Sequence, residues 1–241
     1  MMRTAHIGSK RLLAVAAAAL LLGGCATTTG PMSKVDPFEP WNRAMYDVNE
    51  VVDGKIVKPF AQAYVDYTPK PIQQVIRSFF GNIEDVYSAI NGLLSGKLDS
   101  AGNDMGRVIV NTLAGFGGLI DVASDAGIPK GNLDFGLTLG TWGFPQGPYL
   151  FVPLIGPTTV RDGVGLGVRA YTGLVGYIHD VPARNSLYGI GAVDARAQAL
   201  GAESLIDQAA LDRYAFIRRA YLQRRLYLLY DGKPPPEKEE E

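Results

Sequence analysis

The chain has few side chains that could perform catalysis. Its one cysteine is Cys25, and its two histidines are His6 and His179. Two histidines so far apart do not make a typical zinc site, and His179, beside Asp180, is expected to be a surface or loop residue. The Gly-x-Ser-x-Gly sequence that marks many serine hydrolases is absent. The residues therefore predict no catalytic centre, no metal and no cofactor.

The segment before Cys25 gives that cysteine a different role. An apolar run of eleven residues, 12–22, follows three basic residues: Arg3, Lys10 and Arg11. The run is too short to span a bilayer, but it has the length and position of a signal peptide. The last residue of the run and the three that follow it, Leu22-Gly23-Gly24-Cys25, resemble the bacterial lipobox. We predict that residues 1–24 are a signal peptide and that Cys25 is lipidated. The alternative is an ordinary signal peptide followed by an incidental cysteine.

Lipidation of Cys25 predicts where the protein lies. One acyl chain anchors a protein weakly, at about 0.8 kcal/mol per buried methylene, whereas two or more chains anchor it stably. Bacterial lipoproteins are alike in carrying three chains on this cysteine. The next residue is Ala26 rather than Asp, which in the usual enterobacterial sorting pattern implies export to the outer membrane. We expect the body of the protein to lie in the periplasm or in the periplasm-facing leaflet.

Composition describes the chain that remains after the signal peptide. The 217 residues suffice for one large domain or two small ones. They contain 20 basic and 24 acidic residues, a formal charge of −4, so the composition gives no sign of the basic face that nucleic-acid binding requires. The whole chain is 47% hydrophobic, which is apolar for a secreted domain. We predict a lipidated tether over 25–35, a helical domain over 36–232 and a disordered acidic tail over 233–241.

Apolar residues recur mostly at helical spacing, so the fold is predicted to be mainly α. Asp53-Gly54 is expected to stop the first helix, Thr68-Pro69 to separate two helices, and Gly81-Asn82 to kink or split the longest one. Helices are predicted, in chain order, from about Asp36 to Asp53 and over residues 58–66, 72–94, 100–113, 117–124, 158–178, 190–206 and 209–230.

Residues 135–160 contain no charged side chain but do contain four prolines and five glycines. Each interior proline destabilises a helix by about 3 kcal/mol, so the segment is not a single spanning helix. Irregular backbone also does not face lipid, because its polar groups would lack partners. We therefore expect an apolar, irregular Gly/Pro-rich segment that packs against protein or lines a cavity. Candidates for membrane or lipid contact are Trp142, Phe144, Tyr149, Leu150 and Phe151, with core packing as the alternative.

Charged residues are scarce after this segment. Arg161, Asp162 and Arg169 are the only ones between 135 and 178, so they are candidates for headgroup contact or for a structural ion pair. The last predicted helix has five arginines: Arg213, Arg218, Arg219, Arg224 and Arg225. They form either a solvated face or a surface that attracts anionic lipids or an acidic partner.

A glycine-rich stretch, Gly165 to Ala170, matches the nucleotide-binding pattern Gly-x-Gly-x-x-Ala. No predicted strand precedes it, so it fails the structural context that the pattern requires. Close helix packing through small residues is the favoured interpretation. No Gly-x-x-x-x-Gly-Lys-Ser/Thr loop is present either, so the sequence gives no sign of ATP hydrolysis.

Several segments together resemble one family, the MlaA/VacJ outer-membrane lipoproteins. The similarity runs in the family's order from about residue 36 to 232 and is more specific than any single motif above. The N-terminal signature comprises Asn42-Arg43, Asn49, Asp53 and Lys58-Pro59-Phe60. The core and C-terminal segments are residues 107–124, 134–150, 153–163 and 221–225 with Asp231-Gly232.

The resemblance implies a ring-like helical domain embedded in the inner leaflet of the outer membrane. Such proteins work with trimeric porins, remove phospholipid misplaced in the outer leaflet and pass it to a soluble periplasmic carrier. They thereby maintain lipid asymmetry, passively and without enzyme activity. A scaffold lipoprotein that binds porins without lipid transfer is the alternative, and a lipid-degrading enzyme is the third hypothesis. The resemblance assigns no role to the acidic tail.

Overall fold

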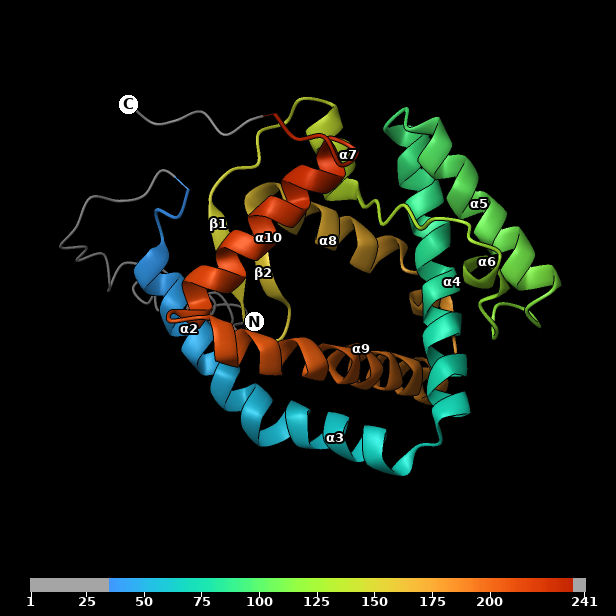
Figure 1. Cartoon of the computed structure of the whole chain (residues 1–241), viewed down its shortest axis with the longest axis horizontal. Helices are drawn as coiled ribbons and strands as arrows, with labels where there is room; N and C mark the ends of the chain where they lie inside the picture. Colours follow the sequence, from blue (N-terminus) through green and yellow to red (C-terminus); the bar gives the residue numbers. More distant parts are fainter. Residues whose placement is uncertain (1–34, 236–241) are drawn as a thin grey trace, which may run out of the picture.

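The structure is a computed structural model that describes residues 35–235. The predicted signal peptide, Cys25 and most of the acidic tail lie outside the described residues. The described part is mainly helical, and its helices follow one another around a ring with one short hairpin in its wall (Figure 1). The predicted mainly α, ring-like fold is confirmed.

The first side of the ring is one long helical rod. Helix α2 (Glu39–Val52) passes through a π-helical turn, η1 (Asp53–Val57), into α3 (Lys58–Tyr67). The prediction that Asp53-Gly54 ends a helix is therefore wrong. The carboxylate of Asp53 accepts two hydrogen bonds from Arg196, at 2.7 and 2.6 Å, so the turn is stabilised by a distant helix. The rod ends at Thr68, before Pro69, as predicted.

Helix α4 (Lys70–Leu94) forms the next side, and α5 (Leu98–Leu113) packs on its outer surface (Figure 1). Helix α4 remains helical through Gly81-Asn82, so these residues do not split it. The predicted helix over 117–124 is wrong, since only α6 (Val122–Asp125) forms there. Positive φ angles at Phe116, Gly117 and Gly118 interrupt the helical backbone before it.

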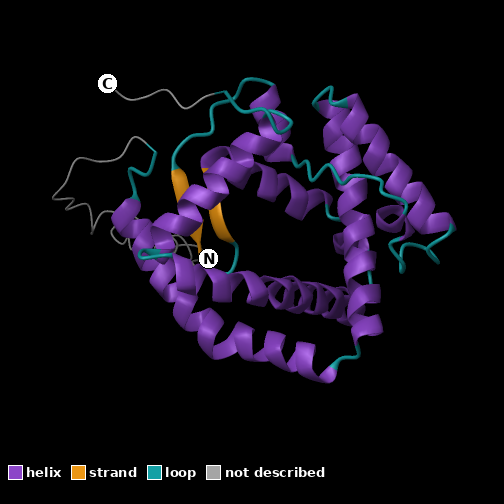
Figure 2. Ribbon diagram, viewed as in Figure 1, coloured by secondary structure: helices purple, strands orange, loops and turns teal. Residues whose placement is uncertain are grey.

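The uncharged segment contains short regular elements. It forms α7 (Phe135–Thr141) and an antiparallel hairpin of β1 (Tyr149–Val152) and β2 (Gly156–Thr159), in which Tyr149 pairs with Thr159 (Figure 2). The expectation of a wholly irregular segment is therefore corrected. Strands of four residues are too short to show a clear alternation of apolar and polar side chains.

The remaining helices close the ring. They are α8 (Val160–Thr172), the short helix η2 (Leu174–Tyr177), α9 (Val181–Ala209) and α10 (Arg213–Leu229). Helix α9 packs along α3, and α10 contacts α7 and the hairpin. The predicted helix over 158–178 stops early, because the backbone of Gly173 is not helical. Helix α9 starts earlier than predicted, because Asp180 caps it by accepting a hydrogen bond from the Ala183 amide at 2.7 Å.

The distribution of polar and apolar side chains is unusual. Among the described residues, the buried set contains more polar and charged side chains than apolar ones, including Asp85, Asp104 and Arg107. The buried aromatic cluster is small and joins α2, β1 and α10; it consists of Tyr46, Tyr149, Phe151 and Tyr214. Many large apolar side chains are exposed instead. Within residues 35–235, no helix combines the length and apolarity needed to cross a bilayer.

Candidate functional site

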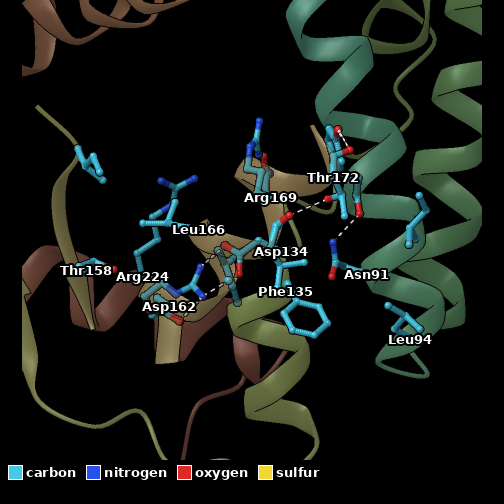
Figure 3. Close-up of a pocket in the computed structure, with 18 of the residues that line it drawn as sticks. Asn91, Leu94, Asp134, Phe135, Thr158, Asp162, Leu166, Arg169, Thr172 and Arg224 are labelled. Atoms are coloured by element: carbon cyan, nitrogen blue, oxygen red, sulfur yellow. Dashed lines mark hydrogen bonds and ion pairs between the residues drawn. The ribbon is translucent and has the colours of Figure 1, made fainter. Parts of the chain in front are cut away.

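Two cavities adjoin inside the ring. The larger, of about 560 Å³, is lined by α4, α7, α8, α10 and the hairpin (Figure 3). The smaller, of about 490 Å³, is lined by α4, α8, η2 and α9. Four residues line both: Tyr87, Leu166, Arg169 and Leu174. The two spaces therefore meet beside α8, and each is large enough for a sizeable organic ligand.

The larger cavity has an amphipathic lining. Its apolar side chains come from α4, α7, α8 and α10 and include Ile90, Leu94, Phe135, Leu166 and Leu228. The same cavity is lined by charged residues: Asp134, Asp162, Arg169, Arg224 and Arg225. It can therefore accommodate a molecule with both a charged part and an apolar part.

Arg225 is the centre of a buried ion network in the cavity wall. Its guanidinium donates to Asp162 at 2.6 Å and forms an ion pair with both oxygens of Asp134. The Tyr221 hydroxyl donates to Asp162 at 2.6 Å. Burial raises the pKa of Asp134, but the hydrogen bonds and charge of Arg225 outweigh this and hold the pKa below its usual range. The network ties α10 to the starts of α7 and α8.

The structure places the three predicted headgroup candidates differently. Arg161 is buried, lies 3.5 Å from Asp162 and donates to the Phe144 carbonyl at 3.4 Å. Arg161 and Asp162 therefore fit the structural ion-pair interpretation. Arg169 lines both cavities. It forms a bidentate ion pair with Glu84, one bond of which is 2.6 Å long, and its guanidinium lies 5.2 Å from the Tyr87 ring centre.

The five apolar candidates also separate into two groups. Tyr149 and Phe151 lie in the aromatic core, and Leu150 between them is half-buried. Core packing therefore accounts for these three candidates. Trp142 and Phe144 are 51% and 56% exposed. The Trp142 indole N–H donates to the Leu94 carbonyl at 2.9 Å. None of the five lines either cavity, and Trp142 and Phe144 remain candidates for contact with a membrane.

The N-terminal signature residues hold α2 against the hairpin. The Asn42 side chain donates to the Tyr149 carbonyl at 3.0 Å and accepts from the Phe151 amide at 2.9 Å. It therefore satisfies the edge of β1 as a neighbouring strand would. The side-chain amide oxygen of Asn49 accepts from the Leu154 amide at 2.8 Å. These asparagines are structural residues that fix one wall of the ring.

The structure assigns separate roles to the arginines of α10. Arg213 pairs with Glu50 at 3.0 Å, Arg218 with Asp36 at 2.6 Å, and Arg225 with Asp134 and Asp162. Most of the set is therefore neither a solvated face nor a lipid-attracting stripe. Two members differ from the rest: Arg219 is exposed, and Arg224 lines the larger cavity. The sequence presented Arg224 as one of five and gave no signal that distinguished it.

Gly165 confirms close helix packing at the glycine-rich stretch. A side-chain carbon at this position would lie 2.6 Å from the Gly136 nitrogen, so α8 approaches α7 through glycine backbones. His179 is exposed in the loop before α9, as predicted. Residues 35–235 contain no group of His, Cys, Asp and Glu side chains placed to hold a metal ion.

Comparison with known proteins gives a consistent result. The MlaA lipoprotein family matches the chain over residues 34–228. The chain is 34% identical to the intermembrane phospholipid transport system lipoprotein MlaA of Escherichia coli (strain K12), over 94% of this chain and 92% of that protein. The protein of the same description from Haemophilus influenzae is 33% identical, over 96% and 95% of the two chains.

A solved structure is also similar. It was described in a study of the structural basis for maintenance of bacterial outer membrane lipid asymmetry. The TM-score is 0.69 at 33% identity, and the match covers 80% of this chain and 98% of the solved one. An uncharacterized protein of Rickettsia bellii is 32% identical over 84% of this chain and 80% of its own length.

Proposed function

The chain belongs to the MlaA lipoprotein family, and on that premise we propose that it removes misplaced phospholipid from the outer leaflet of the outer membrane. It passes this lipid to a soluble periplasmic carrier and so maintains lipid asymmetry. It is anchored by lipid on Cys25 in the periplasm-facing leaflet, and a trimeric porin holds it in place. Transfer is passive, and the protein is not an enzyme.

The joined amphipathic cavities are the observation that carries this proposal. A phospholipid that crosses hydrocarbon unaided loses the water around its charged headgroup, which is costly. A path with charged groups for the headgroup and apolar walls for the acyl chains lowers that cost. The larger cavity offers both kinds of lining, and it shares Leu166 and Arg169 with the smaller one.

The exposed apolar surface supports a position within a leaflet. On α5, exposed apolar side chains recur at helical spacing up to the following loop: Leu98, Met105, Ile109, Leu113 and Phe116. We call this set the α5 face. The charged residues Asp104 and Arg107 of the same helix are buried against α4 instead. A soluble monomer rarely exposes so continuous an apolar surface, whereas acyl chains would cover it.

The charged side chains in the larger cavity support transfer rather than bond cleavage. Asp134 and Asp162 are both ion-paired with Arg225, so neither is a free general base. The ionised groups instead provide fixed charge along the path. This arrangement suits the repeated passage of an intact lipid.

The proposal is tested by measuring phospholipid on the surface of cells that lack the gene. We expect surface phospholipid to rise in these cells and to return to its normal level when the wild-type gene is supplied. The Leu166→Trp variant should not restore the normal level, because the indole would fill the junction of the cavities. Leu205→Trp is the control, because Leu205 is exposed on α9 and lines neither cavity. Unchanged surface phospholipid in the deletion strain would refute the proposal, and the purified protein holding a porin but no lipid would favour the scaffold alternative.

A further inference from the structure

Three arginines lie along the joined cavities. Arg224 extends from α10 into the larger cavity, Arg169 lies on α8 at the junction, and Arg77 extends from α4 into the smaller cavity. Figure 3 shows Arg224 on one wall of the larger cavity and Arg169 on another. Each part of the path therefore has a guanidinium group in its lining.

These arginines differ in whether they already have an acidic partner. Arg169 is paired with Glu84. Arg224 and Arg77 are exposed, and neither guanidinium group forms an ion pair or hydrogen bond with any residue from 35 to 235. Arg225, the other arginine of the larger cavity, is buried, and both of its terminal guanidinium nitrogens are paired with aspartates. Arg224 and Arg77 are thus the guanidinium groups available to a ligand within the two cavities.

A guanidinium group is well suited to a phosphate diester. Its planar array of N–H donors matches two phosphate oxygens, and it remains charged at every physiological pH. Apolar side chains line the same cavities beside these guanidinium groups. Near Arg224 these include Leu228 and Leu166, and near Arg77 they include Phe80 and Ile83. The same side chains can contact acyl chains while the phosphate is bound.

We propose that Arg224 and Arg77 bind the phosphate of a lipid headgroup at successive positions along the path. Arg169 connects the two positions by exchanging its Glu84 partner for the phosphate as the headgroup passes the junction. This inference rests on the proposed function and names the residues that recognise the lipid. Phosphate is shared by the common phospholipids, so these residues select phospholipids over uncharged lipids rather than one headgroup over another.

The test measures lipid binding by the full lipidated chain in mild detergent. The probes are fluorescent phosphatidylethanolamine and fluorescent diacylglycerol with the same acyl chains. Arg224→Gln and Arg77→Gln are compared with Arg219→Gln, which removes an exposed arginine of α10 outside both cavities. We expect phosphatidylethanolamine affinity to fall about tenfold, or about 1.4 kcal/mol, in the two cavity variants only. Diacylglycerol affinity should not change, and Arg224→Lys should recover part of the loss.

Other outcomes overturn distinct parts of the account. If the wild-type chain does not bind phosphatidylethanolamine, the proposed function itself fails. If the wild-type chain binds but the cavity variants match Arg219→Gln, only the phosphate assignment fails. An equal loss for both lipids would show a structural effect and would also overturn the assignment. Displacement of the lipid probe by inorganic phosphate alone would identify a free-phosphate site and not a headgroup site.

Discussion

Arg107 is a buried arginine that joins three segments of the chain. Its Nε lies 2.9 Å from Asp85, its Nη2 lies 3.0 Å from Asp121, and its Nη1 donates to the Ile128 carbonyl at 2.9 Å. Burial lowers the pKa of Arg107, but the Asp85 hydrogen bond and the two acidic charges raise it above its usual range. In this protein such polar residues connect helices where a soluble domain would use apolar packing.

Asn42 is a second residue of this kind, and its truncation should be costly. Asn42→Ala leaves the buried Phe151 amide and Tyr149 carbonyl without their partner. We expect a loss of about 2–4 kcal/mol in the free energy of unfolding, measured by denaturant titration. Asn185→Ala, which changes an exposed residue of α9, should alter stability by less than about 0.5 kcal/mol. Equal effects of the two changes would contradict the structural role of Asn42.

Asp104 predicts a pH dependence of stability. Burial raises its pKa, although the Gly131 amide donates to it at 2.8 Å. Because the folded pKa lies above the unfolded value of about 3.9, the folded state binds the proton more tightly. The contribution of Asp104 to stability is therefore full below the unfolded pKa and declines as pH rises through the folded pKa.

Asp104→Asn should remove this dependence. The amide oxygen can still accept from the Gly131 amide, but no charge is buried. We expect the variant to be more stable than the wild type at pH 7, with the advantage shrinking as the pH approaches 4. Thermal unfolding at several pH values measures this, with Asp47→Asn at an exposed position of α2 as the control. A variant that is less stable at pH 7 would show that the ionised carboxylate is needed.

For individual residues, the sequence indicated which charged side chains were unusual, but it did not indicate which residues they pair with. Arg161, Asp162 and Arg169 stood out because they are isolated in an uncharged region. Arg161 and Asp162 are neighbours that also pair with each other, but Glu84, which binds Arg169, and Arg225, which binds Asp162, lie more than 60 positions away in the chain. Spacing along one helix does not predict such pairs, and for the same reason Arg224 could not be distinguished from its neighbours.

Helix α8 shows how small residues position an element. Gly165 contacts the backbone of Gly136, whereas Gly163 and Gly167 on the same helix face open space. The glycines of α8 therefore differ in importance although they are equivalent in the sequence. Because Asp134 caps α7 and Asp162 lies on α8, the close approach of the two helices also positions the ion network of the cavity wall.

Substitution of these glycines by alanine should have opposite effects. Gly165→Ala forces α8 away from α7, and we expect it to lower the free energy of unfolding by about 1–3 kcal/mol. Gly167→Ala should raise it by about 0.5–1 kcal/mol, because alanine favours helix and meets no neighbour. Chemical denaturation of both variants checks this. Stabilisation by both changes would contradict the close packing at Gly165.

The element boundaries that the sequence missed have local causes. Gly54 suggested a helix end, but the π-helical turn continues because Arg196 binds Asp53 from another helix. The hairpin of β1 and β2 was missed because its strands are short and its edge is completed by the Asn42 side chain. The break after α3 was predicted because Pro69 acts through its own backbone geometry.

Over residues 35–235 the molecule buries a set of charged side chains and exposes many of its large apolar ones. The ring arrangement was predicted only through resemblance to a family, since periodicity gives helices but not their arrangement. The two cavities arise only when α4, α8, α9 and α10 come together. The α5 face, with Leu113 81% and Phe116 77% exposed, lies on the outer side of α4 (Figure 1). An outward apolar face and an amphipathic interior suit a protein that works within a leaflet.

The most direct measurement is photocrosslinking from inside the ring in living cells. A photoreactive amino acid replaces Leu166, which lines both cavities, or Arg219, which lines neither. After irradiation, mass spectrometry identifies what is attached to the purified chain. The account predicts phospholipid attached at position 166 and little or none at position 219. A folded, lipidated chain with no phospholipid attached at position 166 would contradict the claim that lipid passes through the joined cavities.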